Sequence, residues 1–151
     1  METQPFPLLR QVVLDTTDAR ALAEFYRELL GYSYRPGDEP PGEGQPDEKG
    51  QDWLVLRDQS GSARVAFQQV AALRRSTWPD GEVPQQMHLD MTVPTVADLE
   101  VQHRRALGLG ATILYDRSHD EDEPLWVYAD LDGHPFCIFA APSEPGRSPD
   151  A

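Results

Sequence analysis

The sequence predicts an α+β fold in which two βαβββ modules form an open, cleft-containing mixed β-sheet barrel with the helices outside. Two observations support this prediction. The same order of apolar patterns, one strand followed by a helix and three strands, occurs twice along the 151 residues. Gln11 also precedes Gly31 by the same number of residues as His88 precedes Gly108. Order and spacing that recur in this way indicate a duplicated structural unit.

The first module is expected over residues 8–70. Asp18 is a suitable N-cap for a helix that begins at Ala19, apolar residues follow at helical spacing, and Gly31 supplies the stop. Residues 36–50 are rich in proline, glycine and acidic side chains, so we expect a mobile loop that packs no core. The strands of this module are predicted over residues 8–14, 32–34, 53–57 and 64–70.

The second module is expected over residues 87–141, after a connector over 71–86 that contains turn-forming residues. Thr95 and Asp98 have the spacing of a capping box, which predicts a helix that continues to Leu107 with Gly108 near its stop. The strands of this module are predicted over residues 88–93, 111–116, 125–130 and 135–140.

Length and composition restrict the class of protein. The chain suits a single domain over residues 8–141 with a flexible tail over 142–151. Its 13 basic and 26 acidic residues give a net charge of −13, which argues against nucleic-acid and membrane partners because both need clustered Lys and Arg. No apolar run of about 18 residues and no signal region occur. With Cys137 as its single cysteine, we expect a soluble, cytoplasmic protein.

The stretch 87–93 is the first candidate for a functional site. Apolar and polar residues alternate along it, so Leu89 and its alternate neighbours are expected to face the core. His88 and Asp90 then share the opposite face of the strand. Asp90 could orient the imidazole, meet a cationic ligand or point into solvent. His88 could bind a ligand, transfer a proton or simply be a hydrogen-bonded histidine of a cleft.

Three tryptophans and two further histidines complete the candidates. Trp53, Trp78 and Trp126 could clamp a flat ligand, although packing in the core or at a sheet edge also explains them. His103 lies on the second predicted helix and is expected to pack against the sheet, and His134 is expected at a hairpin corner.

Four motifs lie in the predicted elements: VVLDTTD at 12–18, EFYRELLG at 24–31, MHLD at 87–90 and DLDGHPFC at 130–137. Together they resemble those of the vicinal oxygen chelate superfamily, which includes glyoxalase I, ring-cleaving dioxygenases and bleomycin-resistance proteins. The chain is most similar to its glyoxalase-like subgroup, and the resemblance covers about residues 8–141. Because this fold carries metal enzymes and pure binding proteins alike, the resemblance implies the fold more strongly than an activity.

The resemblance implies a metal site with one ligand, usually His or Glu, from each of four strands that face the cleft. The corresponding positions in this chain are Gln11, Gln68, His88 and Cys137. His88 is a good ligand, whereas the amide oxygens of the two glutamines compete poorly for a transition metal. We therefore expect no cofactor, and the open alternative is a divalent metal held by His88 and Cys137. Cys137 is otherwise expected to be a small buried hydrophobe and not a nucleophile.

Two classes of function remain. The first is a binding protein that holds an organic small molecule, such as a natural product or xenobiotic, in a cleft lined by the candidate residues. The second is a lyase or isomerase in which His88 acts as general base and the two glutamines polarise a carbonyl group, with or without a divalent metal. A subunit whose main role is assembly is a third possibility, and the resemblance itself implies a homodimer.

Overall fold

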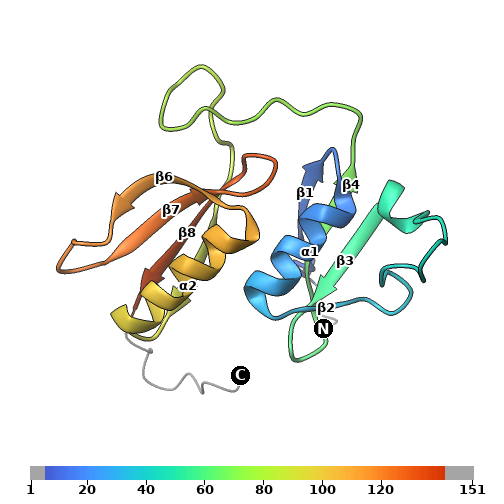
Figure 1. Ribbon diagram of the computed structural model, residues 1–151, viewed down its shortest axis with the longest axis horizontal. Helices are drawn as coiled ribbons and strands as arrows, with labels where there is room; N and C mark the ends of the chain where they lie inside the picture. The colour runs from blue at the N-terminus through green and yellow to red at the C-terminus, as the bar shows by residue number, and fades with distance from the viewer. Residues whose placement is uncertain (1–5, 142–151) are drawn as a thin grey trace, which may run out of the picture.

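The computed structural model describes residues 6–141 and confirms the two βαβββ modules (Figure 1). The expected tail over 142–151 lies outside the described residues. The first module consists of β1 (Val12–Thr16), α1 (Ala19–Leu30), β2 (Ser33–Tyr34), a 3-10 turn (Lys49–Gln51), β3 (Trp53–Arg57) and β4 (Ala63–Gln69). The second consists of β5 (Leu89–Val93), α2 (Val96–Leu109), β6 (Thr112–Arg117), β7 (Leu125–Ala129) and β8 (Pro135–Ala140).

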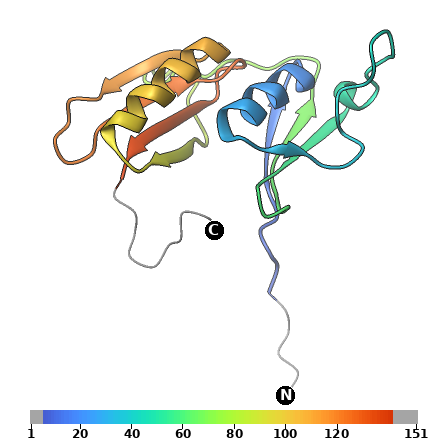
Figure 2. The same cartoon turned by 60° about the horizontal axis from the view of Figure 1, so that its bottom comes forward.

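Each module forms one mixed four-stranded sheet. The strand orders are β1-β4-β3-β2 and β5-β8-β7-β6, and in each sheet the first pair is parallel while the others are antiparallel. Figures 1 and 2 show α1 and α2 next to each other on the same side of the two sheets. The sheets stay open and do not close into a barrel. Among residues 6–141, no helix has the length and apolar character needed to cross a membrane.

The two helices begin at their predicted caps. Asp18 Oδ1 accepts a hydrogen bond from the backbone N–H of Ala21 at 3.0 Å, and Thr95 Oγ1 accepts one from the N–H of Asp98 at 3.1 Å. The predicted end of the second helix is wrong by two residues. Leu109 still packs against the core, and the left-handed residue that ends the helix is Gly110, at φ +110°.

A β-bulge determines which residues of β4 correspond to which residues of β8. The turns before β4 and β8 match, because the backbone N–H groups of Asp58 and Asp130 each donate to a carbonyl four residues on, at 2.9 and 3.0 Å. The first hairpin then contains one extra residue at a register shift between β3 and β4. Cys137 therefore corresponds to Ala66, which occupies the same pairing position, and Gln68 lies two residues further along β4.

The two modules share one hydrophobic core. Phe25 and Tyr26 of α1 contact Phe136 of β8, with ring centroids 5.9 and 6.1 Å apart. Tyr26 also stacks on Phe67 of its own module at 5.9 Å, and Tyr128 stacks on Phe136 at 5.0 Å. All of these rings are buried. Phe67 and Phe136 thus lie beneath the helices.

The loop over residues 36–50 packs more closely than its composition predicts. Asp38 is buried, and its Oδ2 accepts a hydrogen bond from the backbone N–H of Val55 at 2.9 Å. Arg20 of α1 donates to both carboxylate oxygens of Asp47, at 2.8 and 2.9 Å, and to the carbonyl oxygen of Asp38 at 2.7 Å. The hydrogen bonds from Arg20 also lower the pKa of Asp47. One arginine on the helix therefore anchors a loop whose only apolar side chains are prolines.

Candidate functional site

A cavity of about 500 Å³ lies where the two modules meet. We call it the junction pocket. Its walls come from β1, from the connector, from the start of β5 and from the turn between β7 and β8, and its lining is mainly apolar. Such a volume accommodates a drug-sized organic molecule. The lining residues are 12–15, 73–74, 76, 83–89 and 132–135.

The connector contributes a whole wall of the junction pocket. Leu73 and Val83 supply apolar surface, as does Met87 directly after the connector, and Gln85 supplies a polar group. The side-chain oxygen of Gln85 is buried and has no hydrogen-bond partner within residues 6–141. Because buried polar atoms in proteins are normally paired, this oxygen is an acceptor to which a bound molecule could donate.

Three of the predicted site residues lie together beside this pocket. His88 Nε2 lies 3.2 Å from Asp90 Oδ1, and Asp90 of β5 is the pairing partner of Cys137 of β8. One side-chain nitrogen, oxygen or sulfur atom of each residue lies within 4.8 Å of those of the other two. His88 also lines the junction pocket. His88 and Asp90, which were predicted to share a strand face, therefore lie with Cys137 in one cluster at the edge of a cavity.

Cys137 is a neutral thiol in this cluster. Burial raises the pKa of the Cys137 thiol to about 11, and the negative charge and hydrogen bond of Asp90 act in the same direction. A thiol with this pKa is almost fully protonated at neutral pH and is a weak nucleophile. The environment therefore agrees with the expectation that Cys137 does not attack a substrate.

The cluster has some of the properties of a metal site. Its imidazole, carboxylate and thiol groups suit a borderline-soft ion such as Zn²⁺ better than a hard ion. Three protein ligands with an open fourth position are also the arrangement that catalytic zinc sites use. However, binding through sulfur requires the thiol to lose a proton that its surroundings retain. The donor set therefore fits such an ion only when metal binding displaces that proton.

The two predicted glutamines belong to the first module and lie outside the lining of the junction pocket. Gln11 directly precedes β1, as His88 precedes β5, and its side-chain oxygen is buried without a partner within the described residues. Gln68 is exposed and pairs with Trp53 across the first sheet. Because of the bulge, the first-module counterpart of Cys137 is Ala66, whose methyl group binds no metal. Neither glutamine lines the junction pocket.

The three tryptophans do not form one surface. Trp126 stacks on His103 of α2, with ring centroids 3.9 Å apart and planes 18° from parallel, so its indole faces the helix. Trp53 occupies the position in β3 that corresponds to Leu125 in β7, one residue before Trp126. Because successive strand residues face opposite sides, Trp53 lies on the sheet face that points away from the helices. Trp78 is half-buried on the connector and does not line the junction pocket. For Trp126 the contact with α2 favours the packing alternative, and the packing of His103 against the sheet is as expected.

Sequence reasoning missed a buried network around Asp130. Its Oδ2 accepts hydrogen bonds from Tyr26 Oη at 2.7 Å and from His134 Nδ1 at 2.8 Å. Its Oδ1 accepts from the backbone N–H groups of Asp132 and His134, at 2.9 and 3.0 Å. Tyr26 belongs to the first module, so the network joins the two modules, and His134 carries it to the wall of the junction pocket. One signal of this network was present in the sequence. Tyr26 lies in the apolar stripe of the first helix, and a buried hydroxyl needs a hydrogen-bond partner.

The network shifts the pKa values of its members. Burial lowers the pKa of His134, but the hydrogen bond and charge of Asp130 outweigh burial, so the pKa is raised overall. Burial, reinforced by the charge of Asp130, raises the pKa of Tyr26. A second contact between the modules lies close by, where Thr16 Oγ1 donates to Asp132 Oδ2 at 2.6 Å. His134 thus occupies the expected hairpin corner, and it also links the pocket to the core.

Comparison with known proteins agrees with this architecture. A family model described as a glyoxalase-like domain matches residues 11–139. FosX, a genomically encoded fosfomycin resistance protein from Listeria monocytogenes, is 12% identical with a TM-score of 0.64, covering 91% of this chain and 95% of its own. A glyoxalase/dioxygenase from Nostoc punctiforme is 17% identical with a TM-score of 0.62, covering 95% and 99%.

A glyoxalase/bleomycin resistance protein/dioxygenase family enzyme from Burkholderia phytofirmans PsJN is 17% identical with a TM-score of 0.59, covering 87% and 96%. One further FosX structure is described as a complex with Mn(II) and sulfate. No curated protein matches the chain. At these identities the likeness to solved structures establishes the fold.

Proposed function

Since this chain belongs to the glyoxalase-like domain family, we propose that it is a cytoplasmic protein that binds an organic small molecule in the junction pocket. The observation that carries this proposal is the pocket itself, a mainly apolar cavity of about 500 Å³. Cavities that bind organic ligands combine apolar walls with a few well-placed polar groups. Here those groups include the unpartnered oxygen of Gln85 and the imidazoles of His88 and His134.

The charges of the pocket favour an uncharged or cationic ligand. Asp15 and Asp132 line the cavity together with one cationic side chain, that of Arg74. The net charge of −13 on the whole chain acts in the same direction. A ligand with an apolar ring system and an N–H or O–H group facing Gln85 satisfies these conditions. FosX is described as a fosfomycin resistance protein, and this fold relative supports a natural product or xenobiotic as the ligand.

The His88–Asp90–Cys137 cluster favours a second candidate, a lyase or isomerase. Without metal, Asp90 beside Nε2 holds the imidazole of His88, and Nδ1 remains available as a general base. A divalent ion held by the three residues would instead supply Lewis-acid polarisation of a carbonyl group. The metal-free and metal-assisted mechanisms exclude each other if the metal ion binds the nitrogen of His88 that would act as the general base.

Calorimetric titration with a library of uncharged and cationic aromatic compounds tests the binding proposal. We expect at least one compound to bind saturably with a stoichiometry of one. Val13→Trp fills the pocket from β1 and is expected to abolish this binding. His119→Ala removes an exposed histidine outside the pocket and is expected to leave it unchanged. Absence of saturable binding across the library, or binding that survives in Val13→Trp, would refute the proposal.

Metal analysis separates the two candidates. Protein purified without chelator is analysed by inductively coupled plasma mass spectrometry, in parallel with His88→Ala and with His119→Ala as the matched control. A binding protein without a cofactor contains no stoichiometric metal. One equivalent of divalent metal that is present in the His119→Ala control and lost only in His88→Ala would establish the cluster as a metal site and favour the enzyme.

We also propose that the protein is a homodimer. The glyoxalase-like family assignment supports this proposal, and so does the surface of β6, an edge strand on which Ile113 and Tyr115 are exposed. An edge strand that carries apolar side chains is suited to pairing with a second chain. Sedimentation velocity of the wild type and of Ile113→Lys tests this. A monomer at all concentrations, or a dimer unaffected by the substitution, would exclude the β6 edge as the interface.

A further inference from the structure

A second cavity, of about 670 Å³, lies in the first module between the segment before β1 and the turn that joins β3 to β4. Its lining is unusual. Four of its ten lining residues are arginines, and none is acidic. In the whole chain, by contrast, acidic residues outnumber basic ones by 26 to 13. We call this cavity the arginine pocket. It is lined by Leu8, Leu9, Arg10, Arg35, Val55, Arg57, Gly61, Ser62, Ala63 and Arg64.

Two of these arginines are held in place through a single nitrogen. Arg57 Nε donates to the carbonyl oxygen of Gly61 at 2.7 Å, and Arg64 Nε donates to Asp58 Oδ2 at 2.6 Å. Within residues 6–141 these contacts leave the two terminal nitrogens of each guanidinium without a hydrogen-bond partner. A guanidinium presents five N–H donors in a rigid fork that matches the oxygens of carboxylates and phosphates. Fixed side chains with free donors therefore form a prepared site for an oxyanion.

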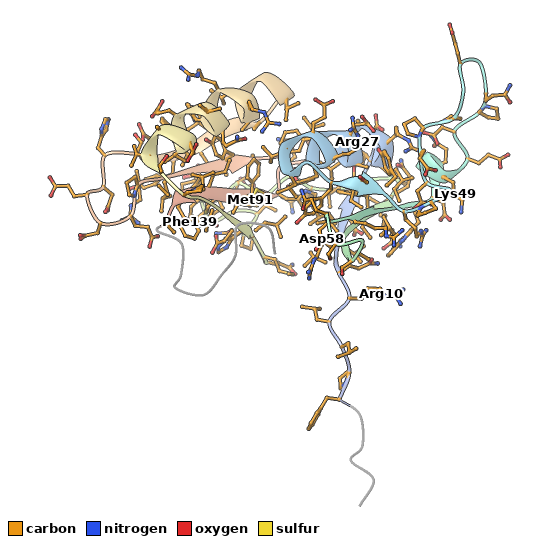
Figure 3. All side chains as sticks on the ribbon, turned by 90° about the horizontal axis from the view of Figure 1, so that it is seen from below. Arg10, Arg27, Lys49, Asp58, Met91 and Phe139 are labelled. Atoms are coloured by element: carbon orange, nitrogen blue, oxygen red, sulfur yellow. The ribbon has the colours of Figure 1, made fainter. Side chains whose placement is uncertain are left out.

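Charge pairing leaves an excess of positive charge at this pocket. Arg35 is paired with Asp38, with Nη2 3.0 Å from Oδ2, and Arg64 is paired with Asp58. Arg10 and Arg57 have no carboxylate partner among residues 6–141. Figure 3 shows Arg10 where the N-terminal segment leaves the first module, near the turn that carries Asp58. Two unpaired guanidinium groups beside one cavity attract anions even though the chain as a whole is acidic.

Apolar side chains border the same pocket. Leu8 and Leu9 precede β1 in the chain, and they are 93% and 89% exposed. Val55 adds buried apolar surface from β3. Leucines left in water beside free guanidinium groups suit a molecule with an apolar part and a negatively charged group. An inorganic anion would use the arginines and leave the leucines exposed.

We propose that the arginine pocket binds a small organic oxyanion, a carboxylate or phosphate monoester with an apolar chain or ring. The guanidinium groups of Arg10, Arg57 and Arg64 hold the oxyanion, and Leu8 and Leu9 cover its apolar part. This site is separate from the junction pocket, with which it shares no lining residue. It also has the opposite charge preference, so the protein would take two chemically different ligands.

Calorimetric titration with octyl phosphate, below its micelle-forming concentration, tests this proposal. We expect saturable binding with a stoichiometry of one, weaker binding of inorganic phosphate, and none of octanol or octylamine. Arg10→Gln is the informative variant because Arg10 makes no contact on which the described fold depends, and it is expected to weaken binding about tenfold. The double variant Arg57→Gln/Arg64→Gln is expected to abolish binding. Arg104→Gln removes an exposed charge from α2 and is expected to leave the affinity within about twofold.

Further measurements separate the roles of the residues and exclude other partners. Leu8→Ser/Leu9→Ser is expected to weaken binding of octyl phosphate but not that of inorganic phosphate. Val13→Trp, which blocks the junction pocket, is expected to leave octyl phosphate binding intact. Equal loss in Arg104→Gln and Arg10→Gln would overturn the proposal, as would binding of octanol. Binding to phosphatidylglycerol vesicles without binding of the free phosphate ester would also overturn it, and would assign the arginines to a membrane surface instead.

Discussion

Replacing Tyr26 by Phe removes a single oxygen atom from the buried network that joins the two modules. The hydroxyl of Tyr26 donates to Asp130 Oδ2 at 2.7 Å, and both residues are buried. A hydrogen bond to a charged group contributes about 1.5–3 kcal/mol. Asp130 keeps three other donors, two backbone N–H groups and the imidazole of His134. We therefore expect Tyr26→Phe to cost about 1.5–3 kcal/mol without unfolding the protein.

Urea denaturation followed by circular dichroism measures this cost. For a chain of this length, the expected loss corresponds to a fall in Tm of about 4–10 °C. Tyr32→Phe is the matched control, because Tyr32 is half-buried and its hydroxyl has no hydrogen-bond partner among residues 6–141. We expect the control to change stability by less than about 0.5 kcal/mol. Equal effects of the two substitutions would show that the phenol of Tyr26 contributes through packing, and that the network does not stabilise the contact between modules.

Four further substitutions test the fold. The raised pKa of His134 means that its pairing with Asp130 stabilises the protein below the unfolded pKa, and that this contribution is lost as pH rises through the folded pKa. The difference in urea stability between wild type and His134→Gln should therefore be larger at pH 5.5 than at pH 9, and a difference that grows with pH would contradict the assignment. Gly108→Ala should stabilise the protein by up to about 1 kcal/mol, because the position is helical and open. Gly110→Ala should destabilise it by about 1–2 kcal/mol, because Gly110 has a φ of +110° and an added Cβ would lie 2.9 Å from Leu131 Cδ2. The reverse order of the two variants in thermal unfolding would place the helix end at Gly108. Arg20→Gln should increase amide exchange in residues 36–50 with little effect elsewhere, whereas unchanged exchange would show that the loop is held by its backbone alone.

Local signals predicted the elements of this fold well. The helix over Ala19–Leu30 has an N-cap, a regular apolar stripe and a glycine stop, and the structure places it at the predicted residues. These signals act within one or two turns of the chain, so sequence alone contains them. In the second module, the helix N-cap located α2 and the alternation of apolar residues located β5 in the same way. The glycine at 108 lies inside the helix, and it misplaced the predicted helix end.

The candidate site was predictable in part. Alternation alone places His88 and Asp90 on one strand face, the family resemblance grouped His88 with Cys137, and the structure brings all three together. The extra residue between β3 and β4 was invisible because a bulge changes the pairing register without changing the apolar pattern. The hydrogen bond between Tyr26 and Asp130 spans 104 residues, and no local pattern encodes such a contact.

The position of the connector has a consequence for how this protein could diversify. Residues 71–86 join two sheets whose sequences are constrained by strand pairing and by a shared core, yet this connector contains no helix or strand. Changes in its length or composition alter no sheet register and remove no ring from the core. The same changes would reshape one wall of the junction pocket. Ligand preference can therefore evolve in the tether between the modules while both folded halves stay as they are.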